Sequence, residues 1–456
     1  MRYSWGKHNQ SEGRMARIAQ RRLFGWKEID ELGDLERLTL VLEAIPDEEF
    51  ASLLEAERFR GRNDYPVRAM WNSLLAGVVF QHPSIESLRR ELARNGMLLE
   101  LCGFDPLKGP SAIPPAWAYS RFLKVILRHS KELGGMFRQL VGAIGEAVPD
   151  FGEELAMDGK NIPSFGNPVS DEAKKGTPDG RRDMDADWGV KSYSGVDAKG
   201  KAWEKVTSWF GYKLHLIVDS RYELPVDFRL TKASVAEQPV ALEMLDELAE
   251  RAPTVAERAK HLSADKGYDD GKIIVKAHDD LDIAPIIDIR NLWKDGEKTK
   301  MVKGSTNVVY DYRGNVSCLC PKTLTPHTMC YGGYERARES LKYLCPARAK
   351  GLTCAGQAEC TTGRQIRIPL SADRRVFTPV ARSSHTWTRL YDMRTAVERV
   401  NSRIDGAFMF EHHYIRGKAK MEARVTIAFI VMLAMALGRI RQNQPGLMRS
   451  LVKRAA

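Results

Sequence analysis

The spacing of hydrophobic residues divides the chain into a helical part, an α/β part and a second helical part. From position 47 to 145, apolar residues recur every three or four positions, which is the period of an amphipathic helix. The pattern predicts helices over three segments, residues 67–80, 84–104 and 116–148. Ser84 has the side chain and position of an N-terminal cap for the second segment. Helical periodicity resumes near residue 385 and continues to the C-terminus.

Between the helical parts, short apolar runs alternate with turns and helical segments. We expect strands over residues 153–158, 205–219, 223–234, 261–265 and 283–290, with helices over 235–252 and 271–282. The first strand is expected to stop at Asp158 and the fourth at Asp265, and the polar segment 171–195 is expected to be a long loop. This order of elements indicates an α/β fold.

The most apolar run, residues 425–438, is too short to cross a bilayer and predicts a buried helix. The basic N-terminus has no apolar segment behind it, so no secretory signal is expected. Both observations favour a cytoplasmic protein without a membrane anchor.

Residues 390–405 carry two stripes when they are placed on an ideal helix. The apolar stripe consists of Leu390, Met393, Val397, Val400 and Ile404. A second stripe, roughly a quarter turn away, consists of Tyr391, Arg394, Glu398, Asn401 and Asp405. A solvated helix face has no need of a tyrosine, an arginine and two acids in register, so the polar stripe is a candidate site.

Composition and net charge indicate what class of molecule the protein binds. The 456 residues are enough for two or three units, and 43% hydrophobic with 28% charged residues is typical of a globular protein and excludes a disordered one. The formal net charge of +11 favours a polyanion such as nucleic acid, although a basic protein without such a partner stays possible on charge alone.

Three acids are candidates for one site: two end predicted strands, and the third lies on the polar stripe. Asp158 and Asp265 end predicted strands, where α/β sheets bind their ligands, and Glu398 lies on a helix whose apolar stripe would pack on the sheet. Converging carboxylates repel one another unless divalent cations neutralise them. Taken singly, each strand-end acid is more often a cap or turn residue. Together with the basic composition, they indicate metal-assisted phosphoryl chemistry.

Four blocks of the sequence resemble a known family. In order they are "AMDGKNIPSFG", "DADWGVKSYSG" with "WFGYKLHLIVD", "LSADKGYDD", and "YDMRTAVERVNSRIDGAF". They resemble bacterial insertion-sequence transposases of the DDE type. The segment "YPVRAMWNSLLAGVVFQHPSIESLRREL" is similar to the helical domain that precedes the catalytic core in one branch of them. The resemblance implies a ribonuclease-H-like α/β core, a mixed sheet flanked by helices, with an all-α N-terminal domain.

The resemblance also implies a site and a reaction. Its catalytic triad corresponds to Asp158, Asp265 and Glu398, which would hold two Mg²⁺ ions, with Mn²⁺ as the expected substitute. Water would cut the DNA at the ends of the element, and the freed 3′-hydroxyl would attack target DNA. The implied partners are double-stranded DNA, with inverted repeats and a target site, and further copies of the chain in a dimer or larger assembly.

Related transposases carry Tyr, Arg, Glu and Lys along this helix, separated by two, three and six residues. Tyr391, Arg394 and Glu398 match, whereas Asp405 stands where the lysine is expected. Arg394 suits bidentate contact with a phosphate, although it could instead pair with Glu398 four residues on. Two nearby cations, Arg403 and Lys418, could take the place of the missing lysine.

Other polar and aromatic residues near the acids have two readings each. Lys160 and Lys213 are candidate DNA contacts or solvated side chains, and His215 is expected on an outward-facing polar side. Three tryptophans, Trp188, Trp203 and Trp209, could stack on unpaired bases, but core packing is the safer expectation.

Six of the seven cysteines lie between the second and third acids. They are Cys318, Cys320, Cys330, Cys345, Cys354 and Cys360, with His327 among them. Without an export signal, this density favours structural Zn²⁺ over disulfides, with one ion and two spare thiols or two ions helped by His327. The irregular spacing leaves open that the cysteines are unconnected.

These features predict five regions: a basic arm (1–45), a helical DNA-binding domain (46–150), the first part of the catalytic core (151–290), a Cys-rich insertion (291–384) and a C-terminal helical part carrying Glu398 (385–456). The leading hypothesis is a DDE transposase. The alternatives are a catalytically silent DNA-binding regulator derived from one, and a metal-dependent ribonuclease-H-fold nuclease that only hydrolyses.

Overall fold

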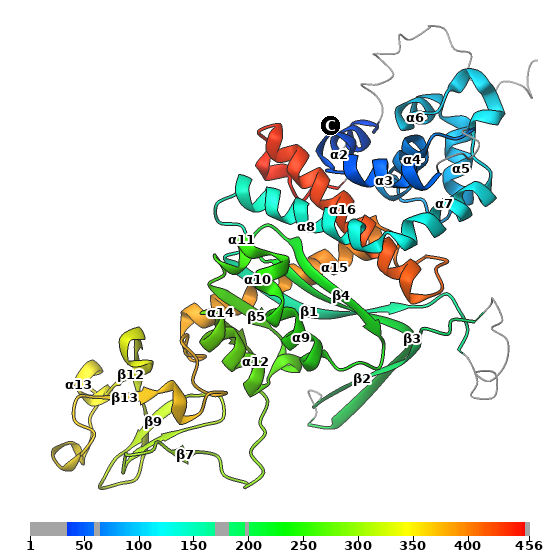
Figure 1. Cartoon of the computed structure of the whole chain (residues 1–456). Helices are drawn as coiled ribbons and strands as arrows, with labels where there is room; N and C mark the ends of the chain where they lie inside the picture. Colours follow the sequence, from blue (N-terminus) through cyan, green and yellow to red (C-terminus); the bar gives the residue numbers. More distant parts are fainter. Residues whose placement is uncertain (1–33, 59–63, 169–181, 197–199, 452–456) are drawn as a thin grey trace, which may run out of the picture.

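The computed structural model describes residues 34–58, 64–168, 182–196 and 200–451. Most of the expected basic arm, the first part of the expected polar loop and the basic C-terminal tail lie outside these ranges. Figure 1 shows three parts in a row: N-terminal helices at one end, a sheet with its helices in the middle, and the cysteine-bearing insert at the other end.

The N-terminal part is helical, as the periodicity predicts. Its helices are α2 (Glu36–Ala44), α3 (Glu48–Arg58), α4 (Val67–Val79), α5 (Ile85–Arg94), α6 (Gly96–Cys102), α7 (Ala116–Arg128) and α8 (Ser130–Ala147). The cap at the start of α5 is confirmed, because Ser84 Oγ accepts a hydrogen bond of 3.1 Å from the backbone N–H of Ser87.

The middle part is a six-stranded mixed sheet. Its strands are β1 (Glu154–Pro163), β2 (Asp187–Val196), β3 (Ala202–Asp219), β4 (Leu224–Lys232), β5 (His261–Ala264) and β6 (Ala284–Ile287). The long strand β3 pairs antiparallel with β1, β2 and β4, while β1, β5 and β6 run parallel to one another. The second half of β3 is thus hydrogen-bonded to β1 on one side and to β4 on the other.

Two local predictions for this sheet are wrong. Strand β1 does not stop at Asp158 but continues to Pro163, because its residues pair one for one with β3 from Leu216 to Gly211. Within the described part of the expected polar loop, residues 187–196 form β2, which pairs with residues 202–211 of β3. In both cases pairing with a distant strand overrides the weak local preference of polar and glycine-rich sequence.

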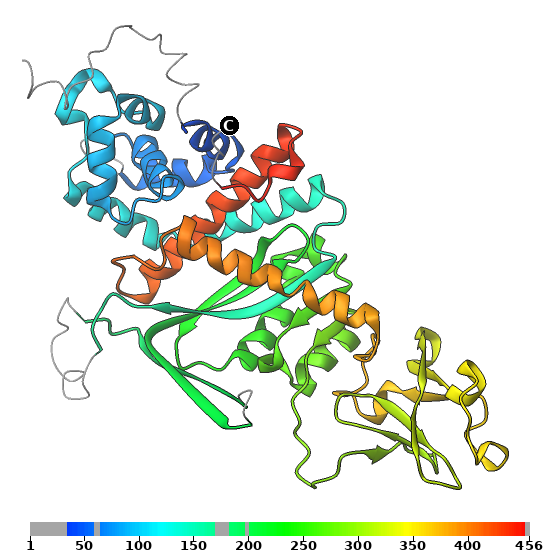
Figure 2. The ribbon, with the colours of Figure 1, turned by 180° about the vertical axis from the view of Figure 1, so that it is seen from behind.

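Helices cover both faces of the sheet. Helix α9 (Glu237–Asp246) and the short α12 (Gly271–Val275) lie on the face seen in Figure 1, and α15 (Thr395–Ala407) crosses the opposite face in Figure 2. The stripe predicted for α15 is largely confirmed, since Val397, Val400 and Ile404 are buried. The expected single helix is, however, broken: α14 (His385–Asp392) and α15 are separated by a tight turn at residues 393 and 394.

Helix α16 (Lys418–Arg441) joins the N-terminal helices to the sheet. It packs against α8, α2 and α4 on one side and against β4 on the other. It is long and apolar enough to cross a membrane, but most of its length is buried inside the molecule, which confirms the predicted buried helix. One continuous hydrophobic core therefore runs from the N-terminal helices into the sheet.

The insert has its own core. It begins after β6 and contains two small antiparallel sheets, β10-β9-β8-β7 and β11-β12-β13. The strands span Lys300–Met301 (β7), Val308–Tyr310 (β8), Val316–Leu319 (β9), Pro326–Thr328 (β10), Cys330–Glu335 (β11), Ser340–Leu344 (β12) and Gln365–Pro369 (β13), with α13 at Pro346–Lys350. A second hydrophobic cluster, separate from the main core, lies between these sheets.

Candidate active site

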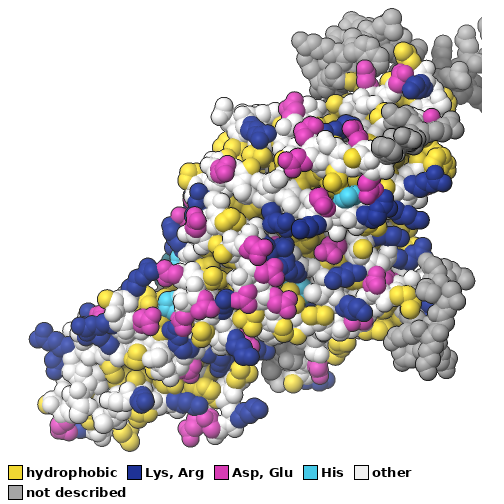
Figure 3. Space-filling view, in the orientation of Figure 1, with side chains coloured by type: hydrophobic (Ala, Val, Ile, Leu, Met, Phe, Trp, Pro, Cys, Tyr) yellow, Lys and Arg dark blue, Asp and Glu magenta, His cyan; other side chains and the backbone are white. Residues whose placement is uncertain are grey.

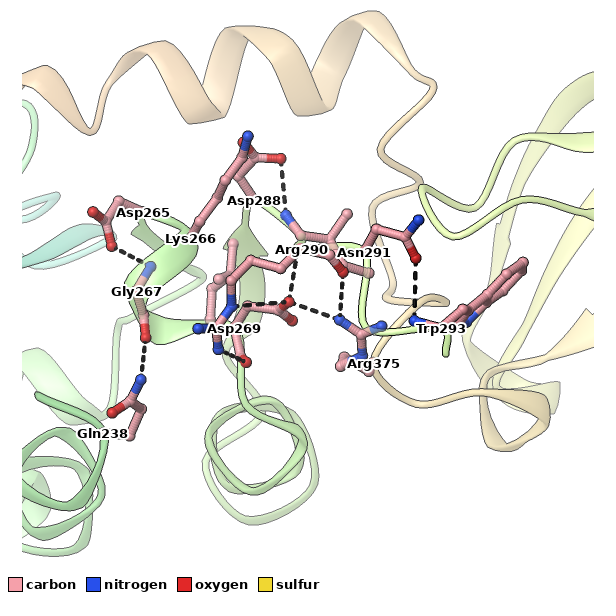
Figure 4. Close-up of polar contacts among 12 residues, drawn as sticks. Gln238, Asp265, Lys266, Gly267, Asp269, Asp288, Arg290, Asn291, Trp293 and Arg375 are labelled. Carbon is pink, nitrogen blue, oxygen red and sulfur yellow. Dashed lines mark hydrogen bonds and ion pairs between the residues drawn. The ribbon is translucent and has the colours of Figure 1, made fainter. Parts of the chain in front are cut away.

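Asp158 and Asp265 lie side by side at the edge of the parallel part of the sheet. The register between β1 and β5 pairs Met157 with Ala264, so the two aspartates follow at corresponding positions on neighbouring strands. Residues in register on parallel strands point to the same face. Asp265 directly follows β5 and caps the short helix at Lys266–Tyr268, where its Oδ1 accepts a hydrogen bond of 2.7 Å from the N–H of Gly267 (Figure 4).

The first of these carboxylates is buried in an unfavourable electrostatic environment. Burial raises the pKa of Asp158 to about 6, and the negative charges of Asp265 and Glu237 add to this effect. A hydrogen bond from the N–H of Gly159 and the charge of Lys191 oppose it but do not cancel it. A cation that binds beside such a carboxylate stabilises its charged form.

Glu237 is a third acid beside the two aspartates, and the sequence analysis missed it. It is the first residue of α9, the helix that follows β4. A Cβ atom at Gly159 would lie 2.8 Å from Glu237 Oε1. A Cβ atom at Gly267 would lie 3.0 Å from Glu237 Oε2 and 2.8 Å from Asp265 Oδ1. The two glycines thus make room for the acids, and an acid in the first turn of the helix after β4 was the available signal.

Glu398 lies on α15 above the same face of the sheet, but it is turned toward Arg394. The Arg394 guanidinium is 3.0 Å from Glu398 Oε1, and the Glu398 side chain is 55% exposed. Arg394 also feels the charge of Asp158. Arg394 therefore interacts with Glu398 and with the charge of Asp158, and the i,i+4 ion pair that the sequence offered as an alternative is formed.

Tyr391 forms one side of this site. Its ring stacks on that of Trp387 with centroids 4.7 Å apart and planes 11° apart, and the Arg394 guanidinium lies 5.6 Å from the Tyr391 ring centroid. Burial raises the pKa of Tyr391, and the nearby negative charges include that of Asp265. The stack fixes the start of the polar stripe next to the aspartates.

Asp405 is explained by a partner on β1. Lys160 Nζ donates a hydrogen bond of 2.5 Å to Asp405 Oδ2, and both side chains are largely buried. A lysine thus occupies this place after all, but it comes from the strand that carries Asp158 rather than from α15. The suggestion that Arg403 replaces the missing lysine is wrong, because Arg403 turns away to pair with Glu223 at 2.8 Å. Lys418 begins α16, where its backbone N–H donates to Asp185.

The remaining strand candidates, Lys213 and His215, are two residues apart on β3 and lie on the same face of the sheet. Lys213 is nearly buried, donates to the Val235 carbonyl at 2.8 Å and lies 3.7 Å from Glu237 Oε1. His215 was expected to face outward but is buried, with Nε2 2.9 Å from Thr231 Oγ1; burial and Lys213 lower its pKa to about 4.

The three tryptophans of this region differ in burial. Trp209 is buried and donates to the Tyr212 carbonyl, as expected for core packing. Trp188 and Trp203 are 54% and 47% exposed, so for them the core expectation is wrong. Both lie on the ribbon formed by β2 and the first half of β3, which extends beyond the helices covering the sheet (Figure 1).

The residues that follow Asp265 also hold the insert. Asp269 is buried and accepts hydrogen bonds of 2.7 Å from the backbone N–H of Arg290 and from the Arg375 guanidinium (Figure 4). Arg290 lies where the chain enters the insert and Arg375 lies close to where it leaves. One carboxylate four residues from Asp265 thus fixes both ends of the insert.

The carboxylates of this site meet part of what a divalent cation requires. Asp158 and Asp265 supply adjacent hard oxygen atoms, the ligand type that Mg²⁺ prefers. Across the described part of the chain, no three His, Cys, Asp or Glu side chains are already placed around a common metal position. Two of the three predicted ligands therefore fit, and the third, Glu398, is held by Arg394.

Comparison with known proteins gives the family. The family model of the transposase DDE domain matches residues 149–434, which is more than half of the chain and encloses Asp158, Asp265 and Glu398. No curated protein and no solved structure matches. The sheet with its flanking helices and the N-terminal helices agree with such a protein. The chain therefore belongs to the family of DNA-binding transposases that carry a DDE domain.

Proposed function

We propose that the protein cuts DNA at the ends of an insertion sequence and joins the freed 3′-hydroxyl ends to target DNA. The observation that carries the proposal is the pair Asp158 and Asp265, adjacent on parallel strands with the pKa of Asp158 raised to about 6. The strand order β4-β3-β1-β5-β6, with three antiparallel strands followed by two parallel ones, supports a ribonuclease-H-like core.

Asp158 and Asp265 would hold Mg²⁺, and Glu398 would be the third ligand. When bound, a pair of such ions polarises phosphate oxygens and activates the attacking water or hydroxyl. The protein's own part is to hold Asp158 and Asp265 side by side, to place Arg394 and Lys160 against phosphate oxygens, and to set Tyr391 and Trp387 beside the DNA end. In this role Lys160 is oriented by Asp405.

Arg394 connects DNA binding to completion of the metal site. Its ion pair with Glu398 is half exposed, and exposed pairs of this kind contribute at most about 1 kcal/mol. A DNA phosphate offers the guanidinium a bidentate partner. Arg394 would then exchange Glu398 for phosphate, and the free carboxylate would turn toward Asp158.

Two DNA ends must be brought together before joining, so we propose that the protein acts as a dimer or larger assembly on DNA, in the cytoplasm of a bacterial cell. The net charge of +11 supports binding to a polyanion. On the face shown in Figure 3, basic and acidic side chains are interspersed, so specific recognition would rest on placed residues rather than on one basic surface.

The test uses the DNA that borders the coding region. Incubated with these ends, target DNA and Mg²⁺, the protein should yield cleaved ends and joined products. Asp158→Asn should lower both reactions at least about 1000-fold, as loss of several kcal/mol of metal-based stabilisation implies, while binding to the ends is unchanged. Asp246→Asn, at an exposed acid paired with Lys276, is the control and should be fully active.

Each other outcome contradicts the proposal in a defined way. Cleavage without joining would identify a nuclease, and binding without either reaction would identify a regulator. Cutting that survives Asp158→Asn would remove Asp158 from the site.

A further inference from the structure

The six cysteines of the insert differ in whether they line one small cavity. Five of them, together with His327, line a single small cavity of about 20 Å³. Cys330 lies on β11 and does not line this cavity. A cavity of this size holds one water molecule or one small ion. All seven cysteines of the protein are free thiols, so none of the five is used in a disulfide.

Cys318 belongs to the hydrophobic core rather than to the cavity's chemistry. It follows Val316 on the buried face of β9 and is part of the insert's hydrophobic cluster. Its thiol donates a hydrogen bond to the His327 carbonyl at 3.7 Å. A thiol used as a donor within an apolar cluster is an inert structural cysteine. Four cavity-lining sulfur atoms remain, those of Cys320, Cys345, Cys354 and Cys360.

Hydrogen-bond donors surround the sulfur atoms of Cys320 and Cys360. The Thr323 hydroxyl and the backbone N–H groups of Lys322, Thr323 and Gly356 donate toward Cys320 Sγ. Gly356 approaches so closely that a Cβ atom there would lie 3.1 Å from Cys320 Sγ and 2.8 Å from Pro321 Cδ. Cys360 Sγ accepts a hydrogen bond of 3.3 Å from Asn307 Nδ2. Such donors around sulfur are the outer contacts that orient metal-bound cysteines.

The segment that supplies two of these cysteines, Cys354 and Cys360, has almost no hydrophobic anchor. From residue 348 to 360 every side chain is exposed except those at Cys354, Gly356 and Cys360. The ordinary source of loop stability, buried apolar area, is therefore missing here. A segment of this kind needs a disulfide or a metal ion to hold it, and its cysteines are free.

We propose that Cys320, Cys345, Cys354 and Cys360 bind one structural Zn²⁺ ion as four thiolates, and that Cys318 and Cys330 take no part. Four sulfur ligands without an open position are typical of a closed structural zinc site. In the described residues the four sulfur atoms are not yet gathered around a metal position, so binding would draw the 348–360 segment against β9. Zinc binding of this kind stabilises the insert and leaves the carboxylate site untouched.

The first measurement is metal content of the full-length protein purified without added metal and without chelator. We expect close to one zinc per chain, released by a thiol-blocking reagent and retained against a weak chelator. Replacement by Co²⁺ should give the intense visible absorption of a tetrahedral tetrathiolate site. A protein that contains no zinc and shows no such absorption with Co²⁺ overturns the proposal, whether or not the protein transposes DNA.

Single variants then test the choice of ligands. Cys320→Ser, Cys345→Ser, Cys354→Ser and Cys360→Ser should each lose most of the zinc, whereas Cys330→Ser and Cys318→Ala should retain it. DNA binding by the zinc-free variants reports whether the rest of the chain is folded. Loss of zinc in Cys330→Ser, or its retention in any of the four, contradicts the assignment. If the four variants do not fold, the Co²⁺ spectrum of the unchanged protein still decides.

Discussion

Two carboxylate sites lie beside helix α15 and differ in how far neighbouring cations balance their negative charge. Glu223, in the turn between β3 and β4, is almost fully buried and contacts three arginines, Arg399 and Arg403 of α15 and Arg449 near the C-terminus. At the other group, Asp158, Asp265 and Glu237 crowd together, and the pKa of Asp158 is raised to about 6 by burial and by its acidic neighbours.

The difference separates a structural role from a functional one. Around Glu223 one negative charge is matched several times over, so the cluster fixes α15 to the sheet and has nothing left to bind. At the aspartates negative charge exceeds what the neighbouring cations neutralise, which is unfavourable in the protein alone and becomes favourable once divalent cations bind. Two adjacent residues of α15 face different groups: Arg399 contacts Glu223, and Glu398 lies on the side of the aspartates.

The largest expected effect on stability comes from removing the centre of the balanced group. Glu223→Ala leaves Arg403, itself largely buried, without its carboxylate, and should lower the free energy of unfolding by about 3 kcal/mol. Chemical denaturation measures this change. Glu247→Gln, which removes an exposed ion-pair partner of Arg229, is the control and should change it by less than about 0.5 kcal/mol. Equal effects would mean that the arginine cluster is not structural.

The opposite sign is expected at the unbalanced group. Because the pKa of Asp158 is raised in the folded state from its ordinary value of 3.8 to about 6, the folded protein binds more protons than the unfolded chain between these values. Without metal, stability should therefore fall as pH rises from about 4 to about 6. Asp158→Asn should remove this loss and raise the free energy of unfolding of the metal-free protein at pH 7 by about 2 kcal/mol.

Thermal denaturation with a chelator present measures the gain, which should disappear at pH 4. Addition of Mg²⁺ should stabilise the unchanged protein and not the variant. An Asp158→Asn protein that is less stable than the unchanged one at pH 7 would show that the carboxylate is structural, as Glu223 is.

A smaller effect is expected for the acid that begins α9. Glu237→Gln keeps the shape but removes one of the negative charges beside Asp158, so the pKa of Asp158 should fall and Mg²⁺ should bind about tenfold more weakly. Calorimetric titration with Mg²⁺ measures the affinity. Glu243→Gln, on the same helix, is the matched control. Unchanged affinity in Glu237→Gln would place this acid outside the functional group.

The smallest expected effect concerns the lysine that replaces the usual one. Lys160→Met removes a cation expected to contact a DNA phosphate and should slow cleavage of DNA ends about tenfold, since a charge-assisted hydrogen bond contributes about 1.5–3 kcal/mol. Adding Asp405→Lys should restore most of the rate by placing a lysine at the position that related transposases use. Failure of the double variant to recover would assign the Lys160–Asp405 pair to stability alone.

Much of this arrangement could be predicted from the sequence because it follows local rules. The Ser84 cap, the buried α16 and the apolar stripe of α15 depend on residues close in the chain, and all three are found. The adjacency of Asp158 and Asp265 was also within reach, because each follows a short apolar run and the two runs pair in parallel, Met157 opposite Ala264.

What was missed depends on contacts between distant segments. The continuation of β1 past Asp158 and the formation of β2 are set by pairing with β3. The partner of Asp405 lies on β1, and the position of Arg403 is set by a turn almost two hundred residues earlier in the chain. Glu237 looked like an ordinary first-turn acid until the sheet placed it beside the aspartates.

The position of α16 has a consequence for how the protein is made. This helix fills the space between α2, α4, α8 and β4, yet it is synthesised after all four of them. A growing chain folds from its N-terminus at the pace of translation. Until residues 418–441 leave the ribosome, the N-terminal helices and the sheet lack the surface that joins them, and their apolar faces are open to water and to chaperones. The N-terminal helices and the sheet therefore join in one step that waits for α16, and a chain that stops before residue 418 is expected to aggregate rather than to be partly active.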